Sequence, residues 1–278
     1  MSLPLHVTAP APQRDLSEQL RPEQAARTRP ALSLVVPSYN ESARLPKSFA
    51  ELDAWLSSPA ATPTEVILVD DGSSDDTLAQ LQAYAAARPE VRVLGEPHRG
   101  KAATVRAGML AAEGDLVLFS DADFSAPLSE ARHLVRAARE GAGVVIGSRE
   151  ASGSRREGEP IYRHVMGKGF NLLTRSLIPG VRDTQCGFKL FTREAAQAIF
   201  QDLPSGLGGE IEGPMVTAFD VEVLFLAQRL GFRIEEVPVR WVYAEGSKVS
   251  ALKDAYRMAL DVAKIHVGAW RGSYPDRK

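Results

Sequence analysis

The sequence predicts an α/β protein with a mostly parallel sheet flanked by helices. Short apolar runs alternate with helical patterns from Ala31 onward, and several of these runs end in polar or acidic residues. Alternating strands and helices are typical of βαβ units. In such folds ligands bind in the crevice at the carboxyl ends of the strands, so we expect the polar strand ends to meet there.

The elements follow this alternation in the first half of the chain and depart from it in the second. Strands are expected over 32–36, from 65, and over 91–94, 116–120 and 144–147, and helices over 46–56, 75–88, 101–112 and 128–139. A polar segment over 151–160, expected to be a mobile loop, precedes an apolar helical stripe from Tyr162 to Leu177. A short strand over 189–191, a helix over 219–230, a strand over 234–242 and an amphipathic helix over about 250–267 are expected to follow.

Composition limits the class of protein. The 278 residues are 44% hydrophobic and 24% charged, which suffices for a full core, and we assign residues 31–278 to one domain. The net charge of -2 gives no electrostatic case for nucleic acid as a partner. Cys186 is the only cysteine, so no disulfide can form within the chain and a reducing compartment is expected. No run reaches the roughly 18 apolar residues that span a bilayer, and the proline-containing residues 1–30 are expected to be a mobile tail.

Acidic and polar strand ends predict a divalent-metal site. One apolar strand runs into Asp121-Ala122-Asp123, a second into Asp70-Asp71-Gly72, and a third into Pro37-Ser38-Tyr39-Asn40-Glu41. Carboxylate oxygens suit Mg²⁺ or Mn²⁺, although turns and helix caps also use acids at such positions. The coincidence of three polar strand ends favours a ligand site over three unrelated turns.

These segments, in this order, resemble the nucleotide-sugar glycosyltransferases of family 2, which have the GT-A fold, a Rossmann-like sheet flanked by helices. The resemblance runs from about Leu32 to Lys248 and includes Gly100-Lys101 and Gly147-Ser148-Arg149. Within the family, the segments 183–189, 219–222 and 245–248 are most similar to dolichyl-phosphate β-glucosyltransferases, followed by dolichol-phosphate mannose synthases.

The resemblance implies an inverting, metal-dependent transferase that moves glucose from UDP-glucose to a polyprenyl or dolichyl phosphate. It also implies a peripheral protein at the cytoplasmic face of a membrane, with Mg²⁺ or Mn²⁺ as cofactor. Tyr243-Ala244-Glu245 stand where mannose synthases often carry an Arg, which favours the glucosyl branch. A GDP-mannose donor, a soluble or glycan hydroxyl acceptor, and a non-catalytic nucleotide-binding protein stay open as alternatives, as does the oligomeric state.

Two other classes with similar sheets fit less well. A receiver-type signalling domain has no place for the second acidic pair, Asp121 and Asp123. A sugar-phosphate nucleotidyltransferase would require a Gly-rich basic loop after the first strand, where this chain has Tyr39-Asn40-Glu41.

The resemblance assigns donor-binding roles to three groups of residues. It places the loop residues Pro37, Tyr39, Asn40 and Glu41 at the nucleoside together with Asp71, and gives Asp70 the role of supporting that loop. It places Asp121, Ala122 and Asp123 at the diphosphate, with Asp121 and Asp123 as the metal ligands. Lys101 is expected either to contact phosphate or to begin a solvated helix.

Acceptor and catalytic roles fall on residues of the second half. Arg149 and Arg163, fourteen residues apart, match two arginines of the mannose synthases, and Lys248 is a third cation that the family places near the phosphates. Asp220 and Glu222 are candidate bases, but a phosphate monoester has a second pKa near ~6 and needs little deprotonation, so a capping role for Asp220 is an equal alternative. His98 and Cys186 are expected to carry no chemistry, as a loop histidine and a packed thiol.

Overall fold

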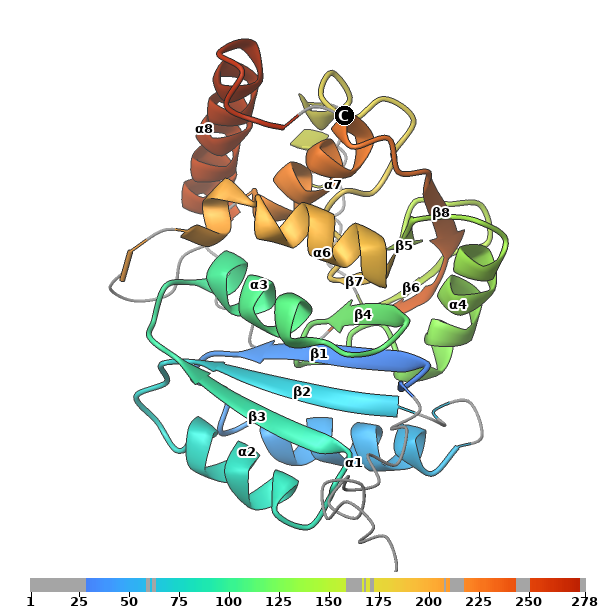
Figure 1. Ribbon diagram of the computed structural model, residues 1–278, viewed down its shortest axis with the longest axis vertical. Helices are drawn as coiled ribbons and strands as arrows, with labels where there is room; N and C mark the ends of the chain where they lie inside the picture. The colour runs from blue at the N-terminus through green and yellow to red at the C-terminus, as the bar shows by residue number, and fades with distance from the viewer. Residues whose placement is uncertain are drawn as a thin grey trace, which may run out of the picture.

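A seven-stranded sheet with helices on both faces forms the body of the protein (Figure 1). The computed structural model describes residues 29–275 apart from 59–60, 62–63, 159–166, 168, 171–172, 208, 211–217 and 244–250, and not the side chains of 206–207 and 251–256. The strand order is β3-β2-β1-β4-β7-β5-β8, and β7 alone is antiparallel to its neighbours. The strands are β1 Leu32–Ser38, β2 Thr64–Asp71, β3 Val91–Glu96, β4 Leu116–Ser120, β5 Val144–Ser148, β7 Phe188–Thr192 and β8 Ile234–Pro238. The predicted mostly parallel sheet is confirmed.

The central strands carry runs of consecutive apolar residues because the sheet is covered on both faces. Every residue of β1 is buried, and Leu34, Val35, Val66 and Ile67 have no exposed surface. A strand that buries both faces cannot alternate polar and apolar residues. Continuous burial therefore accounts for the unbroken apolar runs in the sequence.

Helices cover the two faces in separate layers. Helices α1 and α2 lie on one face, α3 and α6 lie on the other, and α7 and then α8 lie farther out on that second side (Figure 1). The helices are α1 Leu45–Leu56, α2 Thr77–Ala85, α3 Lys101–Ala111, α4 Ala131–Arg139, α6 Arg193–Gln201, α7 Phe219–Arg229 and α8 Ala251–Trp270, with 3₁₀ turns η2 Leu128–Glu130 and η3 Pro204–Leu207.

The order of the strands fixes where a ligand crevice lies. The chain runs outward from β1 through β2 to β3 and then crosses back to β4, which pairs with β1 on its other side. Such a switch point between β1 and β4 opens a crevice at the carboxyl ends of the strands. Helix α3 lies close to this sheet because residue 108 is glycine, where a Cβ would come within 2.4 Å of Val35 Cγ1.

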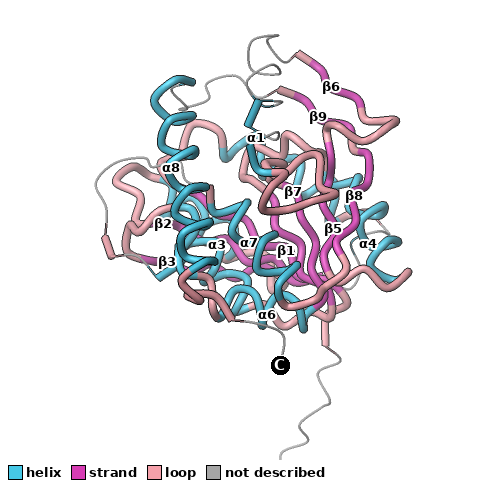
Figure 2. The backbone as a smooth tube through the Cα atoms, turned by 90° about the horizontal axis from the view of Figure 1, so that it is seen from above, coloured by secondary structure: helices cyan, strands magenta, loops and turns pink. Residues whose placement is uncertain are grey.

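The expected strand over 234–242 is wrong as a single element. It divides into β8, which stays in the main sheet, and β9 Arg240–Val242, which pairs with β6 Arg155–Glu157 in a separate two-stranded sheet (Figure 2). Pro238 lacks an N–H for the ladder, and the chain changes sheets just after it. The segment expected to be a loop over 151–160 therefore contains a short strand.

Other predicted boundaries shift or fall outside the description. The tail over 1–30 lies outside the described residues except for Arg29 and Pro30. The stripe from Tyr162 to Leu177 is described only in part: helix ends at Thr174, Leu177 is buried, and Leu173 is 44% exposed. The last helix begins near the expected residue but extends to Trp270. No helix within the described residues is long and apolar enough to cross a membrane.

Candidate active site

A pocket at the carboxyl ends of β1, β2 and β4 gathers most of the predicted donor-binding residues. The loops that follow these strands and the first turns of α3 form its walls. The lining residues are Pro37, Ser38, Tyr39, Glu41, Arg44, Asp71, His98, Gly100, Lys101, Thr104, Asp121, Ala122 and Asp123. Residues from four separate segments of the chain therefore meet at the switch point of the sheet.

The carboxylate of Asp71 organises the wall nearest α3. Its Oδ1 accepts hydrogen bonds from the backbone N–H groups of Arg99, at 2.9 Å, and Gly100, at 3.2 Å. Its Oδ2 lies 2.8 Å from Nδ1 of His98, and the side chain is 4% exposed. Asp71 thus holds the turn before α3 in place while it lines the pocket.

The loop after β1 is supported by residues behind the pocket. The backbone N–H of Asn40, which has a φ of 51°, donates to Ser73 Oγ at 2.9 Å. The N–H of Ser73 donates to Asp70 Oδ2 at 3.0 Å, and the N–H of Ser74 donates to Asn40 Oδ1 at 2.8 Å. Asn40 and Asp70 therefore join the β1 and β2 loops to each other and do not line the pocket themselves.

His98, expected from the sequence to be a loop histidine without chemistry, lines the pocket. Its ring stacks on that of Tyr39 with 3.9 Å between centroids and 1° between planes. The contact joins the loop after β3 to the loop after β1, so it depends on two segments about sixty residues apart. The available signal was its position, three residues before the Lys101 that begins α3. Arg44 and Thr104 were missed, and both line the same pocket, as does Ser38 of the predicted loop over 37–41.

Asp121 and Asp123 follow β4 on the opposite wall. Lys101 Nζ lies 2.6 Å from Asp121 Oδ1, and Asp123 Oδ1 accepts a hydrogen bond from the N–H of Ser125 at 2.9 Å. Burial alone would lower the pKa of Lys101, but Asp121, Asp220 and Asp123 outweigh it and hold the pKa above its ordinary value. Lys101 therefore carries its charge at neutral pH, and its side chain, 37% exposed, lines the pocket and pairs with Asp121 at the start of α3.

The space around Asp121 depends on Gly187. The N–H of Asp121 donates to the carbonyl oxygen of Gly187 at 3.0 Å. A Cβ at Gly187 would come within 1.9 Å of Asp121 Oδ2, closer than any real contact. Only glycine at this position lets the loop before β7 approach the carboxylate.

The donor set fits a hard divalent cation that shares its coordination with another ligand. Asp121 and Asp123 offer carboxylate oxygens from one short turn, the ligand type that Mg²⁺ and Mn²⁺ prefer. Within the described part of the chain, no three His, Cys, Asp or Glu side chains gather into a complete metal centre. A cation held here would need further oxygen ligands, such as those of a diphosphate.

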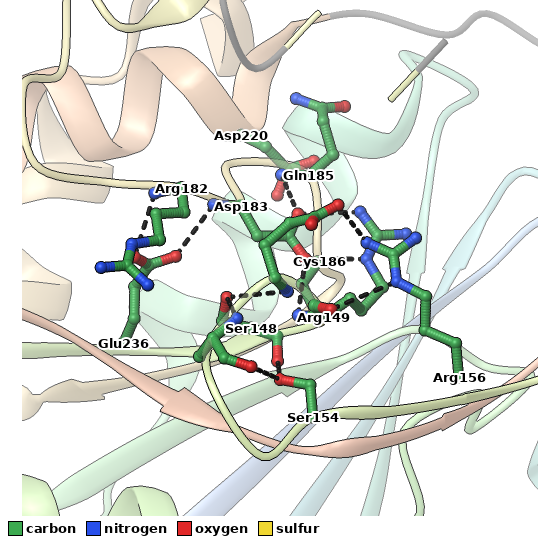
Figure 3. Close-up of polar contacts among 12 residues, drawn as sticks. Ser148, Arg149, Ser154, Arg156, Arg182, Asp183, Gln185, Cys186, Asp220 and Glu236 are labelled. Carbon is green, nitrogen blue, oxygen red and sulfur yellow. Dashed lines mark hydrogen bonds and ion pairs between the residues drawn. The ribbon is translucent and has the colours of Figure 1, made fainter. Parts of the chain in front are cut away.

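Two ion pairs, one partly and one fully buried, join residues that do not line the pocket. The guanidinium of Arg149 donates to both oxygens of Asp183, each at 2.8 Å, in the fork shown in Figure 3. Burial would raise the pKa of Asp183, but Arg149 lowers it to about 2. Lys189, which is 1% exposed, donates to Asp220 Oδ1 and to the carbonyl oxygen of Cys186 at 2.6 Å.

Glu222, the other acidic candidate on α7, is engaged by two different groups. Glu222 accepts from the hydroxyl of Tyr274 at 2.6 Å and from the N–H of Ser205 at 3.0 Å. Arg149, Asp220 and Glu222 do not line the donor pocket. Arg163 and Lys248 lie outside the described residues.

Cys186 is buried, as expected. Burial and the nearby Asp183 raise the pKa of its thiol to about 12. A thiol in this state is not a nucleophile at neutral pH.

Comparison with known proteins identifies the class to which this fold and pocket belong. Residues 33–200 match the family model described as "Glycosyl transferase family 2". A dolichyl-phosphate beta-glucosyltransferase of Drosophila melanogaster is 38% identical over 263 residues, covering 86% of this chain and 77% of that protein. The proteins of the same name in Homo sapiens and Trichomonas vaginalis are 37% and 36% identical, each match covering 86% of this chain and 77% and 75% of theirs.

Solved structures share the GT-A fold. A glucosyl-3-phosphoglycerate synthase from Mycobacterium tuberculosis, solved with Mn²⁺, UDP and glucosyl-3-phosphoglycerate, superimposes with a TM-score of 0.59 at 23% identity, covering 98% of this chain and 89% of that one. A mannosyltransferase from Pyrobaculum calidifontis, in complex with GDP-Man and Mn²⁺, gives a TM-score of 0.57 at 21% identity, covering 88% and 65%. The fold and the pocket define a GT-A glycosyltransferase. The chain belongs to glycosyl transferase family 2.

Proposed function

We propose that this glycosyltransferase moves glucose from UDP-glucose to dolichyl phosphate or another polyprenyl phosphate. The observation that carries the proposal is the pocket at the switch point, where the β1 loop, Asp71 and the pair Asp121 and Asp123 face one space. The relatives named dolichyl-phosphate beta-glucosyltransferase, which match over 86% of the chain, support this choice of sugar and acceptor.

The donor occupies the pocket in this proposal. The loop residues Pro37, Tyr39 and Glu41 face the nucleoside, with Asp71 beside them, and the acids after β4 face the diphosphate. Asp121 and Asp123 would hold Mg²⁺ or Mn²⁺, which supplies positive charge to the departing nucleoside diphosphate. Ala122, between the two acids, lets their backbone lie against the ligand without a large side chain.

Lys101 contributes a permanent positive charge at the same place. Its ammonium already lies beside Asp121, and its raised pKa keeps it protonated at neutral pH. An ammonium beside the diphosphate stabilises the charge that develops on the leaving group. Lys101 therefore orients the donor and assists departure without moving a proton.

The acceptor needs positioning more than deprotonation. A polyprenyl phosphate is already anionic at neutral pH, so a free general base is not required. Asp220 and Glu222 suit such a reaction, because Lys189 and Tyr274 engage their carboxylates away from the donor pocket. We assign both acids to positioning α7, and Arg163 and Lys248 to the acceptor phosphate.

Arg149 has a different part in this scheme. Its guanidinium is engaged by Asp183 and lies over the ring of Trp241, with 5.5 Å to the centroid. We assign it to fixing the loop before β7, on which Gly187 and the position of Asp121 depend. Because the proposed acceptor is a lipid, the enzyme must work at a membrane surface, and we propose that it does so as a peripheral protein at the cytoplasmic face.

A panel of donors and acceptors tests the function. UDP-glucose, UDP-galactose, UDP-N-acetylglucosamine and GDP-mannose are each offered with a short polyprenyl phosphate, and lipid-linked sugar is measured directly. We expect transfer from UDP-glucose to exceed the others by at least about 100-fold, because buried polar groups in a sugar site reject a misplaced hydroxyl strongly. The matching polyprenol, which lacks the phosphate, is the control acceptor and should accept nothing.

Two results would overturn the proposal. Preferred transfer from GDP-mannose would show that the donor is not UDP-glucose. Transfer to 3-phosphoglycerate, with none to the lipid phosphate, would show that the acceptor is a soluble phosphate and not a polyprenyl phosphate.

A further inference from the structure

The turn that carries Asp121 and Asp123 has an unusual backbone conformation. Its last residue, Phe124, has a φ of 45° although its side chain is large and the residue is only 8% exposed. A positive φ is rare for a bulky residue, and such strain persists only where the surrounding structure holds it in place. The shape of this turn therefore depends on the groups that anchor it.

The two ends of the turn have anchors of their own. The N–H of Asp121 donates to the carbonyl oxygen of Gly187 at 3.0 Å, and the N–H of Phe124 donates to the carbonyl oxygen of Asp121 at 3.1 Å. Phe124 also borders a small apolar cavity together with Leu45 and Leu52 of α1. These contacts leave the peptide group between residues 122 and 123 to a separate partner.

That partner is Ser48 of α1. Its Oγ donates a buried hydrogen bond of 2.6 Å to the carbonyl oxygen of Ala122, 74 positions away in the chain. The same hydroxyl lies 3.4 Å from the carbonyl oxygen of Arg44, in the preceding turn of its own helix. A serine hydroxyl has one proton to donate, and the shorter distance assigns that proton to Ala122.

The position of Ser48 on its helix indicates that the hydroxyl has a role. The buried residues of α1 are Leu45, Ser48, Leu52 and Trp55, separated by three, four and three residues, the spacing of one helical face. Ser48 is thus the one polar member of the stripe that packs on the sheet, and it is 8% exposed. A buried polar residue is the informative exception in such a stripe, and here its bond to Ala122 accounts for it.

The bond from Ser48 acts on the orientation of Asp123. The carbonyl oxygen of Ala122 and the N–H of Asp123 belong to one planar peptide group, so holding the oxygen also fixes the plane from which Asp123 projects. Without the hydroxyl, the buried oxygen would lose this donor. The cost of leaving a buried carbonyl unpaired would favour rotation of the peptide group toward the pocket, where solvent can reach it.

We propose that Ser48 is a positioning residue for the divalent metal, holding the turn in the shape that lets Asp121 and Asp123 share one cation. The inference rests on the proposed function, in which these two acids hold Mg²⁺ or Mn²⁺ beside the diphosphate. Ser48 does not line the donor pocket, so it acts through the peptide group of Ala122 and Asp123. Loss of a hydrogen bond that supports a metal ligand typically weakens metal binding about 10- to 100-fold.

Metal binding tests the role of Ser48 without any transfer reaction. Calorimetry measures the affinity for Mn²⁺ at saturating UDP, and separately the affinity for UDP without metal. We expect Ser48→Ala to lose about tenfold or more in Mn²⁺ affinity and to keep the UDP affinity of wild type. The control is Ser57→Ala, because the exposed Ser57 hydroxyl donates to the carbonyl oxygen of Asp53 at 2.8 Å on the same helix. This control should bind Mn²⁺ as wild type does.

Two conservative variants separate the hydrogen bond from the packing of the side chain. Ser48→Thr keeps the hydroxyl and should retain most of the Mn²⁺ affinity. Ser48→Cys is close to serine in size but offers only a weak S–H donor, so its affinity should lie between those of Ser48→Thr and Ser48→Ala. The comparison of Thr with Cys still decides the matter if the Ala variant does not fold.

Three results would overturn the inference. These are wild-type Mn²⁺ affinity in Ser48→Ala, an equal loss of Mn²⁺ affinity in Ser57→Ala, and a loss of UDP affinity without metal that matches the loss for Mn²⁺. The last result would show that Ser48 shapes the nucleoside loop and not the metal turn. Failure of the proposed function is distinguishable. A wild type that binds Mn²⁺ with GDP and not with UDP would contradict the proposed donor, and the same variants compared with GDP would still test Ser48.

Discussion

Gly187 is the residue at which a side chain would do the most damage to the active site. Its missing Cβ lies where Asp121 needs space, 1.9 Å from Oδ2 and 2.4 Å from Cγ. Both atoms belong to a carboxylate that also holds Lys101. The position of one small residue thus governs a metal ligand and a cation together.

We predict that Gly187→Ala lowers the rate of transfer at least about 100-fold, because a displacement of about 1 Å at reacting groups costs that much. The protein should remain folded, since the loop can yield at the surface of the pocket. Transfer at saturating donor and thermal melting are measured together. Gly209→Ala, where an added Cβ meets nothing within 4 Å, is the control and should stay within twofold of wild type. Normal activity of Gly187→Ala would show that Asp121 tolerates displacement.

Asp123→Asn tests the metal assignment directly. The substitution removes a charge from the ligand pair but keeps the volume and the hydrogen bond to Ser125. We expect transfer to fall at least about 100-fold and Mn²⁺ affinity, measured by calorimetry in the presence of UDP, to fall about tenfold or more. The control is Asp115→Asn, an exposed acid away from the pocket. Unchanged Mn²⁺ affinity in the Asp123 variant would place the ion elsewhere.

For single residues, the sequence predicted which side chains lie at the carboxyl edge of the sheet, but not which groups those side chains contact. Strand-end acids such as Asp71 could be placed at the crevice, because parallel strands share one carboxyl edge. Their partners could not be placed. His98 reaches Asp71 and Tyr39 through a turn that tertiary contacts determine, and no periodicity in the sequence encodes such a turn.

The buried pair of Lys189 and Asp220 is the main link between two elements, β7 and α7. Both side chains lie in the interior, at 1% and 7% exposure. Removing one partner of a buried pair leaves the other charge uncompensated and typically costs 3–5 kcal/mol, whereas replacing both with apolar residues costs far less. The pair also positions the first turn of α7, where Phe219 lies beside Lys101.

We predict that Lys189→Met and Asp220→Leu each destabilise the protein by about 3 kcal/mol, and that the double variant loses much less than their sum. Urea unfolding of the four proteins measures this cycle. The double variant should fold and yet transfer more slowly than wild type, since the loop before β7 loses the bond from Lys189 to Cys186. Additive losses would show that the pair is not coupled.

Element prediction succeeded where periodicity was clear and failed where one strand changed partners. The strand over 116–120 and most helices were placed within a few residues, because continuous burial or a helical face marks them. The antiparallel β7 and the division of 234–242 into β8 and β9 depend on pairing between distant segments. Pro238 was the local sign of that division, and only the fold shows that the chain changes sheets there.

At the scale of the whole molecule, the C-terminal end of the described chain packs against α7 and its buried Glu222. Tyr274 packs on Phe225 with 5.2 Å between ring centroids and donates to Glu222. Burial and the Glu222 carboxylate both raise the pKa of Tyr274 above its ordinary value, so the hydroxyl stays a donor throughout the physiological range. The end of the described chain is therefore fixed to α7, the helix that carries Asp220 and Glu222.

Asp183 links stability to pH for the whole fold, because its contacts join the end of β5, the loop before β7 and strand β8. It accepts from Arg149 at the end of β5, lies before β7, and donates its own N–H to Glu236 of β8 at 2.8 Å. Its pKa is about 2 in the folded protein, against 3.8 for an ordinary aspartate. A lowered pKa stabilises the fold above pH 4, and this stabilisation is lost as the pH falls from about 4 to about 2.

We therefore predict that the free energy of unfolding of the wild type falls in this window by about 2 kcal/mol more than that of Asp183→Asn. At neutral pH the variant is less stable, because Arg149 loses its charged partner in the interior. The two stabilities should therefore converge as the pH approaches 2. Urea unfolding at pH 7, 4, 3 and 2 measures the difference, with the exposed acid variant Asp115→Asn as the control that should track the wild type. Parallel curves for wild type and Asp183→Asn would show that the carboxylate titrates normally and that Arg149 does not hold it in the charged state.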